Sequence, residues 1–365
     1  MELNEFIKNQ AKQFGIDICR ITDGKDLKEE RELLEKRKKS KYWPQAFTNQ
    51  DLDQLTKPSL QFENLESIIV VAVNYRNEGD NPYLSDYVTV KDYHLFLKEK
   101  MQDLVDQIRK YLDHDFKFKL FVDTAPFLER ALAKKAGVGF IGKNTMLINP
   151  EYGSNLFLGE IFTDLEIKKD SALDIDCGEC RICIDNCEGG ALKKEYLLAA
   201  EDCISYLTQK KGILSEKEIK KIGSHIWGCD ACQSKCPYNK GKEKNKAREL
   251  DFFNKDLEYF LKLERNNPPQ ELQNTAVMWR GSRILIRNAL IAAANRQEIK
   301  FFELIKEKLD DNSPVIRYYA AYALLKIDYS RAKPIVNNYL KNEANTEVKK
   351  KINKILAAEE DNDGH

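Results

Sequence analysis

Eight of the nine cysteines lie between Cys177 and Cys236, and only Cys19 lies outside this segment. The N-terminus has no apolar signal core, and the longest apolar run, 318–325, is far shorter than the roughly 20 residues of a membrane span. We therefore expect a soluble, cytoplasmic protein without a membrane partner. In that reducing compartment, a dense group of cysteines favours a metal or iron–sulfur site over disulfides. The four histidines are too few for a site built from several histidines.

The spacing of the cysteines predicts two [4Fe–4S] clusters. In the first run, C-x2-C-x2-C-x3-C over 177–187, three thiolates can wrap one cube while the fourth ligates the other cube. The second run, C-x2-C-x3-C-P over 229–237, lacks one cysteine, which Cys203 can supply. A pair of zinc sites is the alternative, but such sites normally show two C-x2-C pairs separated by a longer loop. The expected ligand sets are Cys177, Cys180, Cys183 and Cys236 for one cluster, and Cys187, Cys203, Cys229 and Cys232 for the other.

Hydrophobic patterning predicts three domains. Helices and strands alternate before the cysteines, with a continuous apolar strand over 67–75 and a helix over 123–136. These patterns predict an α/β domain over 1–165, a ferredoxin-like two-cluster domain over 166–245 and an all-α domain over 246–365.

The predicted all-α domain contains a faint internal repeat. Residues 285–293 resemble residues 315–323, and a similar helix begins at Thr346. Such spacing indicates a short HEAT-like solenoid, with an ordinary helical bundle as the alternative. The whole chain has 59 basic and 59 acidic residues, but residues 276–355 contain 16 Lys and Arg against 8 Asp and Glu. The neutral total therefore conceals a basic segment.

Two features before the cysteines have more than one interpretation. Asp123 lies at a predicted strand-to-helix junction, where it can either cap the helix or act in catalysis. The segment 137–144, GVGFIGKN, fits G-x-G-x-x-G but follows a helix, and Asn144 stands where a P-loop needs Ser or Thr. It is either a tight helix-to-strand connection or a loop that lets backbone approach a large ligand closely.

Five blocks, taken in order, resemble the epoxyqueuosine reductase family. The blocks are 123–131, 137–145, 152–154, 203–208 and 227–239. The resemblance implies an oxidoreductase that removes the epoxide oxygen of epoxyqueuosine at the tRNA wobble position, giving queuosine. It also implies a cobalamin in the N-terminal α/β domain, two [4Fe–4S] clusters and a C-terminal HEAT-like domain. An unidentified low-potential electron donor must then supply the clusters, and we expect a monomer.

The resemblance assigns roles to individual residues. It implies that Asp123 is the general acid, and that the corrin is lined by Lys143, Asn144, Ser205 and Asp230. The chain has no Asp-x-His-x-x-Gly motif, so the cobalamin is expected to bind without a protein histidine below the cobalt. The basic segment gains a partner, a tRNA carrying epoxyqueuosine in its anticodon loop. The expected tRNA contacts are Arg280, Arg283 and Arg287, for which a solvated helix face is the alternative.

Three other functions are compatible with parts of the sequence. A corrinoid reductive dehalogenase has a related core, but such proteins typically carry a twin-arginine signal and lack a basic helical tail. A ferredoxin-type electron carrier fused to an interaction solenoid leaves the α/β domain and Asp123 without a role. An RNA-binding scaffold with structural clusters binds tRNA but changes nothing on it.

Overall fold

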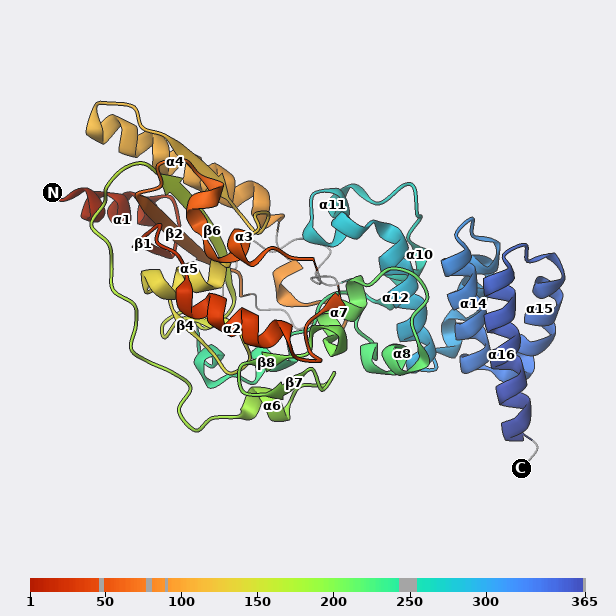
Figure 1. Cartoon of the computed structure of the whole chain (residues 1–365). Helices are drawn as coiled ribbons and strands as arrows, with labels where there is room; N and C mark the ends of the chain where they lie inside the picture. Colours follow the sequence, from red (N-terminus) through yellow and green to blue (C-terminus); the bar gives the residue numbers. More distant parts are fainter. Residues whose placement is uncertain (46–48, 77–80, 89–90, 243–254, 364–365) are drawn as a thin grey trace. The chain divides into compact units, whose positions relative to one another are not determined.

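The computed structural model describes residues 1–45, 49–76, 81–88, 91–242 and 255–363 (Figure 1). The chain divides into two compact units. The first contains Met1–Glu78, Val90–Glu201 and Asp230–Glu249, and the second contains Gly79–Thr89, Asp202–Cys229 and Leu250–His365. The expected boundary at 165/166 falls inside the first unit, and the one at 245/246 lies outside the described residues.

A four-stranded sheet forms the centre of the first unit. Its strand order is β1 (Ile18–Asp23), β2 (Ser67–Asn74), β6 (Leu156–Thr163), β3 (Phe118–Phe121). Every residue of β2 is buried, as the continuous apolar run predicts. All three strand pairs are antiparallel, so the mixture of helices and strands is as expected but the sheet is not the parallel kind usual in α/β proteins.

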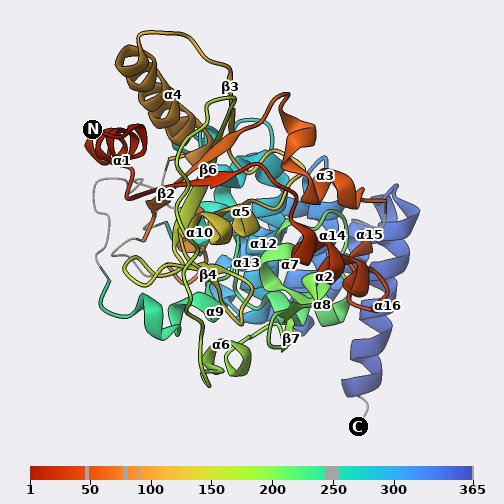
Figure 2. The same cartoon turned by 60° about the vertical axis from the view of Figure 1, so that its left-hand side comes forward.

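Helices pack on both faces of this sheet. Helix α5 (Glu129–Ala136) packs against β1, β2 and β6, where Ile68, Val70 and Ala72 join its apolar face in one core. Helix α4 (Tyr93–Leu112) lies against β3 and β6 on the other side (Figures 1 and 2). The remaining regular elements of this unit are α1 (Leu3–Gln13), α2 (Lys28–Lys38), α3 (Leu52–Thr56), β4 (Phe140–Ile141), β5 (Leu147–Ile148), α6 (Ile182–Asp185), β7 (Leu192–Lys194), β8 (Leu197–Leu198) and α9 (Ala231–Ser234).

The second unit is helical in its described part. Helices α12 (Ser282–Asn295), α14 (Pro314–Ile327) and α16 (Thr346–Asp363) begin at equal intervals along the chain, and α14 packs against both of the others. The repeat found in the sequence therefore corresponds to helices that stack on one another. The other α-helices here are α7 (Ile204–Gln209), α8 (Glu216–Ile222), α10 (Leu257–Lys262), α11 (Gln270–Gln273), α13 (Phe302–Glu307) and α15 (Tyr329–Asn342).

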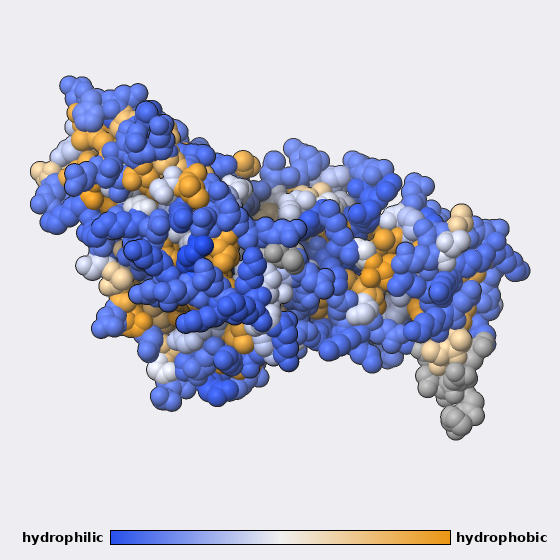
Figure 3. Space-filling view, in the orientation of Figure 1, coloured by the Kyte–Doolittle hydropathy of each residue, from blue (hydrophilic) through white to orange (hydrophobic). Residues whose placement is uncertain are grey.

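The surface is mainly hydrophilic on the face drawn in Figure 3, where polar and charged side chains surround small apolar patches. Among the described residues, no helix has the length and apolar character needed to cross a membrane.

Candidate functional site

Asp123 lies in the loop between β3 and α5, with a left-handed backbone (φ 47°). The helix expected over 123–136 begins only at Glu129, and Leu128 occupies its N-cap position, so Asp123 does not cap it. Instead, the hydroxyl of Tyr93 donates a hydrogen bond of 2.5 Å to Oδ2 of Asp123, and the Asp123 N–H donates one of 2.6 Å to Oε1 of Glu129. A left-handed aspartate costs roughly 1–2 kcal/mol, and such conformations concentrate at functional sites.

Aromatic stacking fixes the position of Tyr93, the first residue of α4. Its ring stacks on Phe157 of β6 at a centroid distance of 4.3 Å with an angle of 6° between the planes, and Tyr75 packs against the same ring at 4.5 Å. No motif in the sequence indicates this role, because Tyr93 and Asp123 are brought together only by the packing of α4 against the sheet.

Two glutamates close to Asp123, Glu160 and Glu129, were also missed by sequence reasoning. Glu160 lies in β6 opposite Phe121 of β3, is fully buried, and has no hydrogen-bond partner for either carboxylate oxygen among the described residues. Burial, reinforced by the nearby carboxylates of Glu129 and Asp123, raises the pKa of Glu160 well above its ordinary value. Burial and then Asp123 raise the pKa of Glu129 to about 7. Both shifts favour the protonated form of these two side chains beside Asp123.

The first predicted ligand set converges on one cavity. A cavity of about 300 Å³ is lined by Cys177, Cys180, Cys183 and Cys236, together with Lys143, Asn144, Ile148, Pro237 and Tyr238. Burial and the thiols of the other three cysteines raise the pKa of Cys183, which shows how close the four groups lie. Among the described residues, no three His, Cys, Asp or Glu side chains are grouped so as to hold a single metal ion. A four-iron cube needs thiolates on the walls of a cavity instead, and four converging cysteines fit it.

Lys143 and Asn144 bind the cysteine loops. The ammonium of Lys143 donates a hydrogen bond of 2.6 Å to the Gly178 carbonyl and pairs with Glu195 at 3.0 Å. The amide of Asn144 donates one of 3.2 Å to the Cys232 carbonyl. Both side chains are thus buried against the loops that carry the thiols.

The second ligand set is divided between the two units, with Cys187 and Cys232 in the first and Cys203 and Cys229 in the second. The Ala191 N–H donates to Sγ of Cys187 at 3.2 Å, a kind of contact that tunes cluster potentials. Cys187 also lines a cavity of about 240 Å³ with Asp185, Asn186, Glu188, Ala231, Ser234 and Lys235. The assignment of this set stays a prediction.

The other two residues expected at the corrin occupy helix starts. Ser205 lies in the first turn of α7, and its carbonyl accepts a hydrogen bond of 2.9 Å from the Thr208 hydroxyl. Asp230 occupies the N-cap position of α9, and its Oδ1 accepts one of 3.2 Å from the Gln233 amide.

The glycine loop is a tight connection between α5 and β4. Gly137 ends the helix with a φ of 82°, and a Cβ there would lie 2.1 Å from the Ser171 carbonyl oxygen. A Cβ on Gly139 would lie 2.4 Å from the Ile148 carbonyl oxygen. Packing within the chain therefore explains these glycines, as the first of the two interpretations has it.

The three arginines expected to contact tRNA do not share one environment. Arg283 of α12 is exposed, and Arg280 is partly exposed, with its guanidinium 3.6 Å from the ring centroid of Trp279. Arg287 is fully buried, so its assignment to the tRNA surface is wrong. Its guanidinium binds protein carbonyls at the end of α7, namely those of Leu207, Thr208, Lys210 and Gly212.

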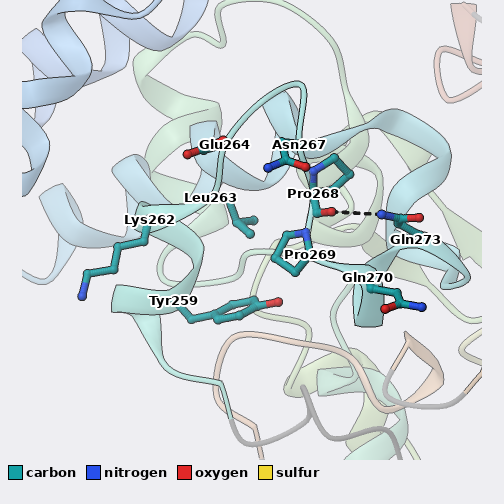
Figure 4. A pocket seen from close by; sticks show the side chains of 9 residues that line it. All are labelled: Tyr259, Lys262, Leu263, Glu264, Asn267, Pro268, Pro269, Gln270 and Gln273. Carbon is teal, nitrogen blue, oxygen red and sulfur yellow. Dashed lines mark hydrogen bonds between the residues drawn. The ribbon is translucent and has the colours of Figure 1, made fainter.

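A separate cavity of about 480 Å³ lies beside α10 and α11 in the second unit (Figure 4). Pro268 and Pro269 form part of its wall, and the Gln273 amide donates a hydrogen bond of 3.2 Å to the Pro268 carbonyl. Its lining contains no cysteine, and none of the residues expected at a site lies in it.

Comparison with known proteins identifies the family. Residues 176–239 match the model of the 4Fe-4S double cluster binding domain, and residues 56–124 match that described as epoxyqueuosine reductase QueG, DUF1730. The epoxyqueuosine reductase of Bacillus anthracis is 32% identical, over 97% of this chain and 97% of that protein. This chain belongs to the epoxyqueuosine reductase family.

Two solved epoxyqueuosine reductase structures have nearly the same fold. One, determined with a tRNA-Tyr epoxyqueuosine-modified stem loop, has a TM-score of 0.85 and 31% identity over 96% of this chain and 97% of that one. The other, from Bacillus subtilis with its aspartate catalytic loop swung out of the active site, has a TM-score of 0.86 and 30% identity over the same shares. Epoxyqueuosine reductases are oxidoreductases, and the four cysteines that line the cavity of this chain fall within the double-cluster region.

Proposed function

We propose that this protein reduces the epoxide of epoxyqueuosine at the wobble position of tRNA to give queuosine. The observation that carries the proposal is the acid site at Asp123. Tyr93 holds this carboxyl at the end of β3, outside the helix that it could have capped. The solved Bacillus subtilis relative has an aspartate in a catalytic loop. We assign the same role to Asp123 and its left-handed loop in this chain.

Asp123 acts as the general acid in this proposal. The epoxide oxygen becomes a poor leaving group when its C–O bond breaks without a proton, so an acid beside it lowers the barrier. The Tyr93 hydroxyl orients one oxygen of Asp123, and the backbone hydrogen bond to Glu129 holds the loop.

Electrons must come from groups other than these. The side chains around Asp123 are two further carboxyl groups and a phenol, and none of them is a reductant. We assign the electron supply to two [4Fe–4S] clusters, the first held by Cys177, Cys180, Cys183 and Cys236, and the second by Cys187, Cys203, Cys229 and Cys232.

Cobalamin is the proposed group that passes the electrons to the substrate. The acidic groups at Asp123 fit a site that provides protons to a separate reducing group, and a bound cobalamin supplies strongly reducing cobalt(I) chemistry there. By the family resemblance, Lys143, Asn144, Ser205 and Asp230 would line the corrin. The hydrogen bonds of Lys143 and Asn144 to the cysteine loops favour short electron paths to it.

The helical unit supplies the tRNA surface. The equally spaced helices α12, α14 and α16 support a HEAT-like arrangement, and the exposed Arg283 with the partly exposed Arg280 are its proposed phosphate contacts. A base in an anticodon loop must be splayed into the reductase site, so such contacts hold the backbone and do not read the sequence.

Nucleoside mass spectrometry tests the function. Epoxyqueuosine-containing tRNA is incubated anaerobically with cluster-reconstituted protein, cobalamin and a low-potential reductant. We expect loss of one oxygen from the modified base, and a loss of activity by a factor of about 10² to 10⁴ in Asp123→Asn, which cannot donate a proton. Asp113→Asn is the matched control, because Asp113 is also a left-handed aspartate (φ 57°) but ends α4.

The outcomes separate the parts of the proposal. Equal activity of Asp123→Asn and the wild-type protein contradicts the acid assignment. If the base keeps its oxygen while iron and cobalt are bound, the substrate assignment fails and reductive dehalogenation becomes the function to test.

A further inference from the structure

The reaction proposed above consumes two protons, whereas Asp123 can carry only one. Two C–O bonds of the epoxide break and a C=C double bond forms, so the substrate takes up two electrons and two protons and the oxygen leaves as water. The electrons come from the reducing groups of the proposed function, on which this inference rests. After its first proton transfer, Asp123 must be protonated again before it can serve a second time.

Glu160 is a carboxyl group buried in the central sheet of the first unit. It lies in the middle of β6, between β2 and β3, and pairs with Val70 on one side and Phe121 on the other. It is 0% exposed, and neither carboxylate oxygen has a hydrogen-bond partner within the described residues. Burying a polar group without a partner costs roughly 1–3 kcal/mol in proteins, and an apolar residue would avoid this cost. A role in structure alone does not explain the glutamate.

Glu129 connects Glu160 with the acid loop. It begins α5, and its Oε1 accepts the backbone N–H of Asp123 at 2.6 Å. The carboxylates of Glu129 and Asp123 both raise the pKa of Glu160. Within the described part of the chain, Arg130 is the cation that lowers the pKa of Glu129. The three carboxyl groups thus form one cluster, with Glu160 at its buried end and Asp123 at its exposed end.

We propose that Glu160 and Glu129 form a proton reservoir that returns a proton to Asp123 within the catalytic cycle. One proton leaves the Glu129 carboxyl for the Asp123 carboxylate, and the Glu160 carboxyl then protonates Glu129. The resulting Glu160 carboxylate takes up a solvent proton after the product has left. The raised pKa of each glutamate favours its protonated form, so each can store a proton close to Asp123. Both are positioning and proton-supplying residues, and of the three carboxyl groups only that of Asp123 touches the epoxide.

The test compares Glu160→Gln with Glu166→Gln. Glutamine keeps the shape of Glu160 but cannot release a proton, and Glu166 is an exposed glutamate just after β6. In the holoenzyme, we expect Glu160→Gln to lower kcat about tenfold at pH 8, with KM unchanged and a smaller loss at pH 6, where solvent protons are more abundant. Small buffer acids should restore the rate of Glu160→Gln and leave the wild-type rate unchanged. Glu129→Gln, which keeps the Oε1 acceptor, should show the same pattern.

A spectroscopic measurement separates the reservoir from the reaction. Infrared spectroscopy of the purified protein at pH 8 should show the C=O stretch of a protonated carboxyl, which disappears in Glu160→Gln and persists in Glu166→Gln. An unchanged band overturns the reservoir. An equal loss of kcat at every pH without rescue by buffer acids also overturns it. If wild-type protein does not reduce epoxyqueuosine, the proposed function fails, while the loss of the band still supports stored protons at Glu160.

Discussion

The hydroxyl of Tyr93 donates a 2.5 Å hydrogen bond to Oδ2 of Asp123, and its ring stacks within 6° of parallel on Phe157. Helix α4 thus fixes a side chain that belongs to the loop after β3. This hydrogen bond orients the Asp123 carboxyl within a loop whose backbone is strained at Asp123.

Removal of the Tyr93 hydroxyl should therefore lower activity without loosening the fold. We expect Tyr93→Phe to reduce kcat about tenfold, which corresponds to about 1.4 kcal/mol, since the ring stacking remains. Tyr111→Phe is the control. It removes an exposed hydroxyl from the same helix, and that hydroxyl donates a hydrogen bond of 2.6 Å to the Met1 carbonyl. Equal rates for wild-type protein and Tyr93→Phe would show that Asp123 needs no orientation by Tyr93.

The four-cysteine cavity makes a prediction about iron content. Cys236→Ser should lower the iron bound after anaerobic reconstitution by about half, because one cube loses a thiolate while the other keeps its four. Cys19 lies in β1 and is outside the predicted ligand sets, so Cys19→Ser should bind as much iron as wild-type protein. Full iron in Cys236→Ser would overturn the first ligand set.

The buried arginine of α12 should matter for stability. Arg287→Ala removes the guanidinium hydrogen bonds to the carbonyls of Leu207, Thr208 and Lys210. The first two keep one donor each, the Lys210 N–H and the Asn288 amide, whereas the Lys210 carbonyl loses its bond to the guanidinium, and a buried group left unsatisfied costs roughly 1–3 kcal/mol. We expect the midpoint of urea unfolding of the helical unit to fall clearly. Arg283→Ala, on the exposed face of the same helix, should change stability by less than about 0.5 kcal/mol. Equal midpoints for the two variants would contradict the buried role of Arg287.

The error about Arg287 shows where sequence reasoning stops. Positions 280, 283 and 287 have the spacing of a helix face, but α12 is apolar nearly all round and buried over most of its length. The repeat offered a better signal, since Arg317, the counterpart of Arg287, is also structural and binds both oxygens of Glu343 at 2.8 Å.

The cluster cysteines could be recognised because they lie close together in the sequence at motif spacing. Asp123 could be recognised because it lies in a block that resembles a family motif. Glu160 could not be recognised, because its neighbours come from the pairing of β6 with β3, two segments about forty residues apart. A single glutamate in an apolar strand is the only signal that the sequence offered for it.

The raised pKa of Glu129 predicts how stability depends on pH. A carboxyl that titrates near 4.5 in the unfolded chain and at about 7 in the folded one binds more protons when folded between these values. Its contribution is therefore fully present below about pH 4.5 and is lost as the pH rises through about 7, by about 3 kcal/mol. Glu129→Gln should flatten this decline in urea unfolding measured from pH 5 to 8. A variant that declines as steeply as wild-type protein would show that Glu129 is not the group responsible.

The exposed cation of α12 predicts the salt dependence of tRNA binding. Each phosphate contact releases condensed counterions, so the slope of log K against log salt should become shallower when a contact is lost. We expect Arg283→Glu to weaken binding of an epoxyqueuosine-containing stem loop about tenfold at low salt, with a slope smaller by about one. Lys168→Glu makes the same change of net charge at an exposed site in the first unit and controls for long-range attraction. If both variants show the same reduction in slope, Arg283 acts only through overall charge, and the phosphate contact must be sought elsewhere on the basic helices.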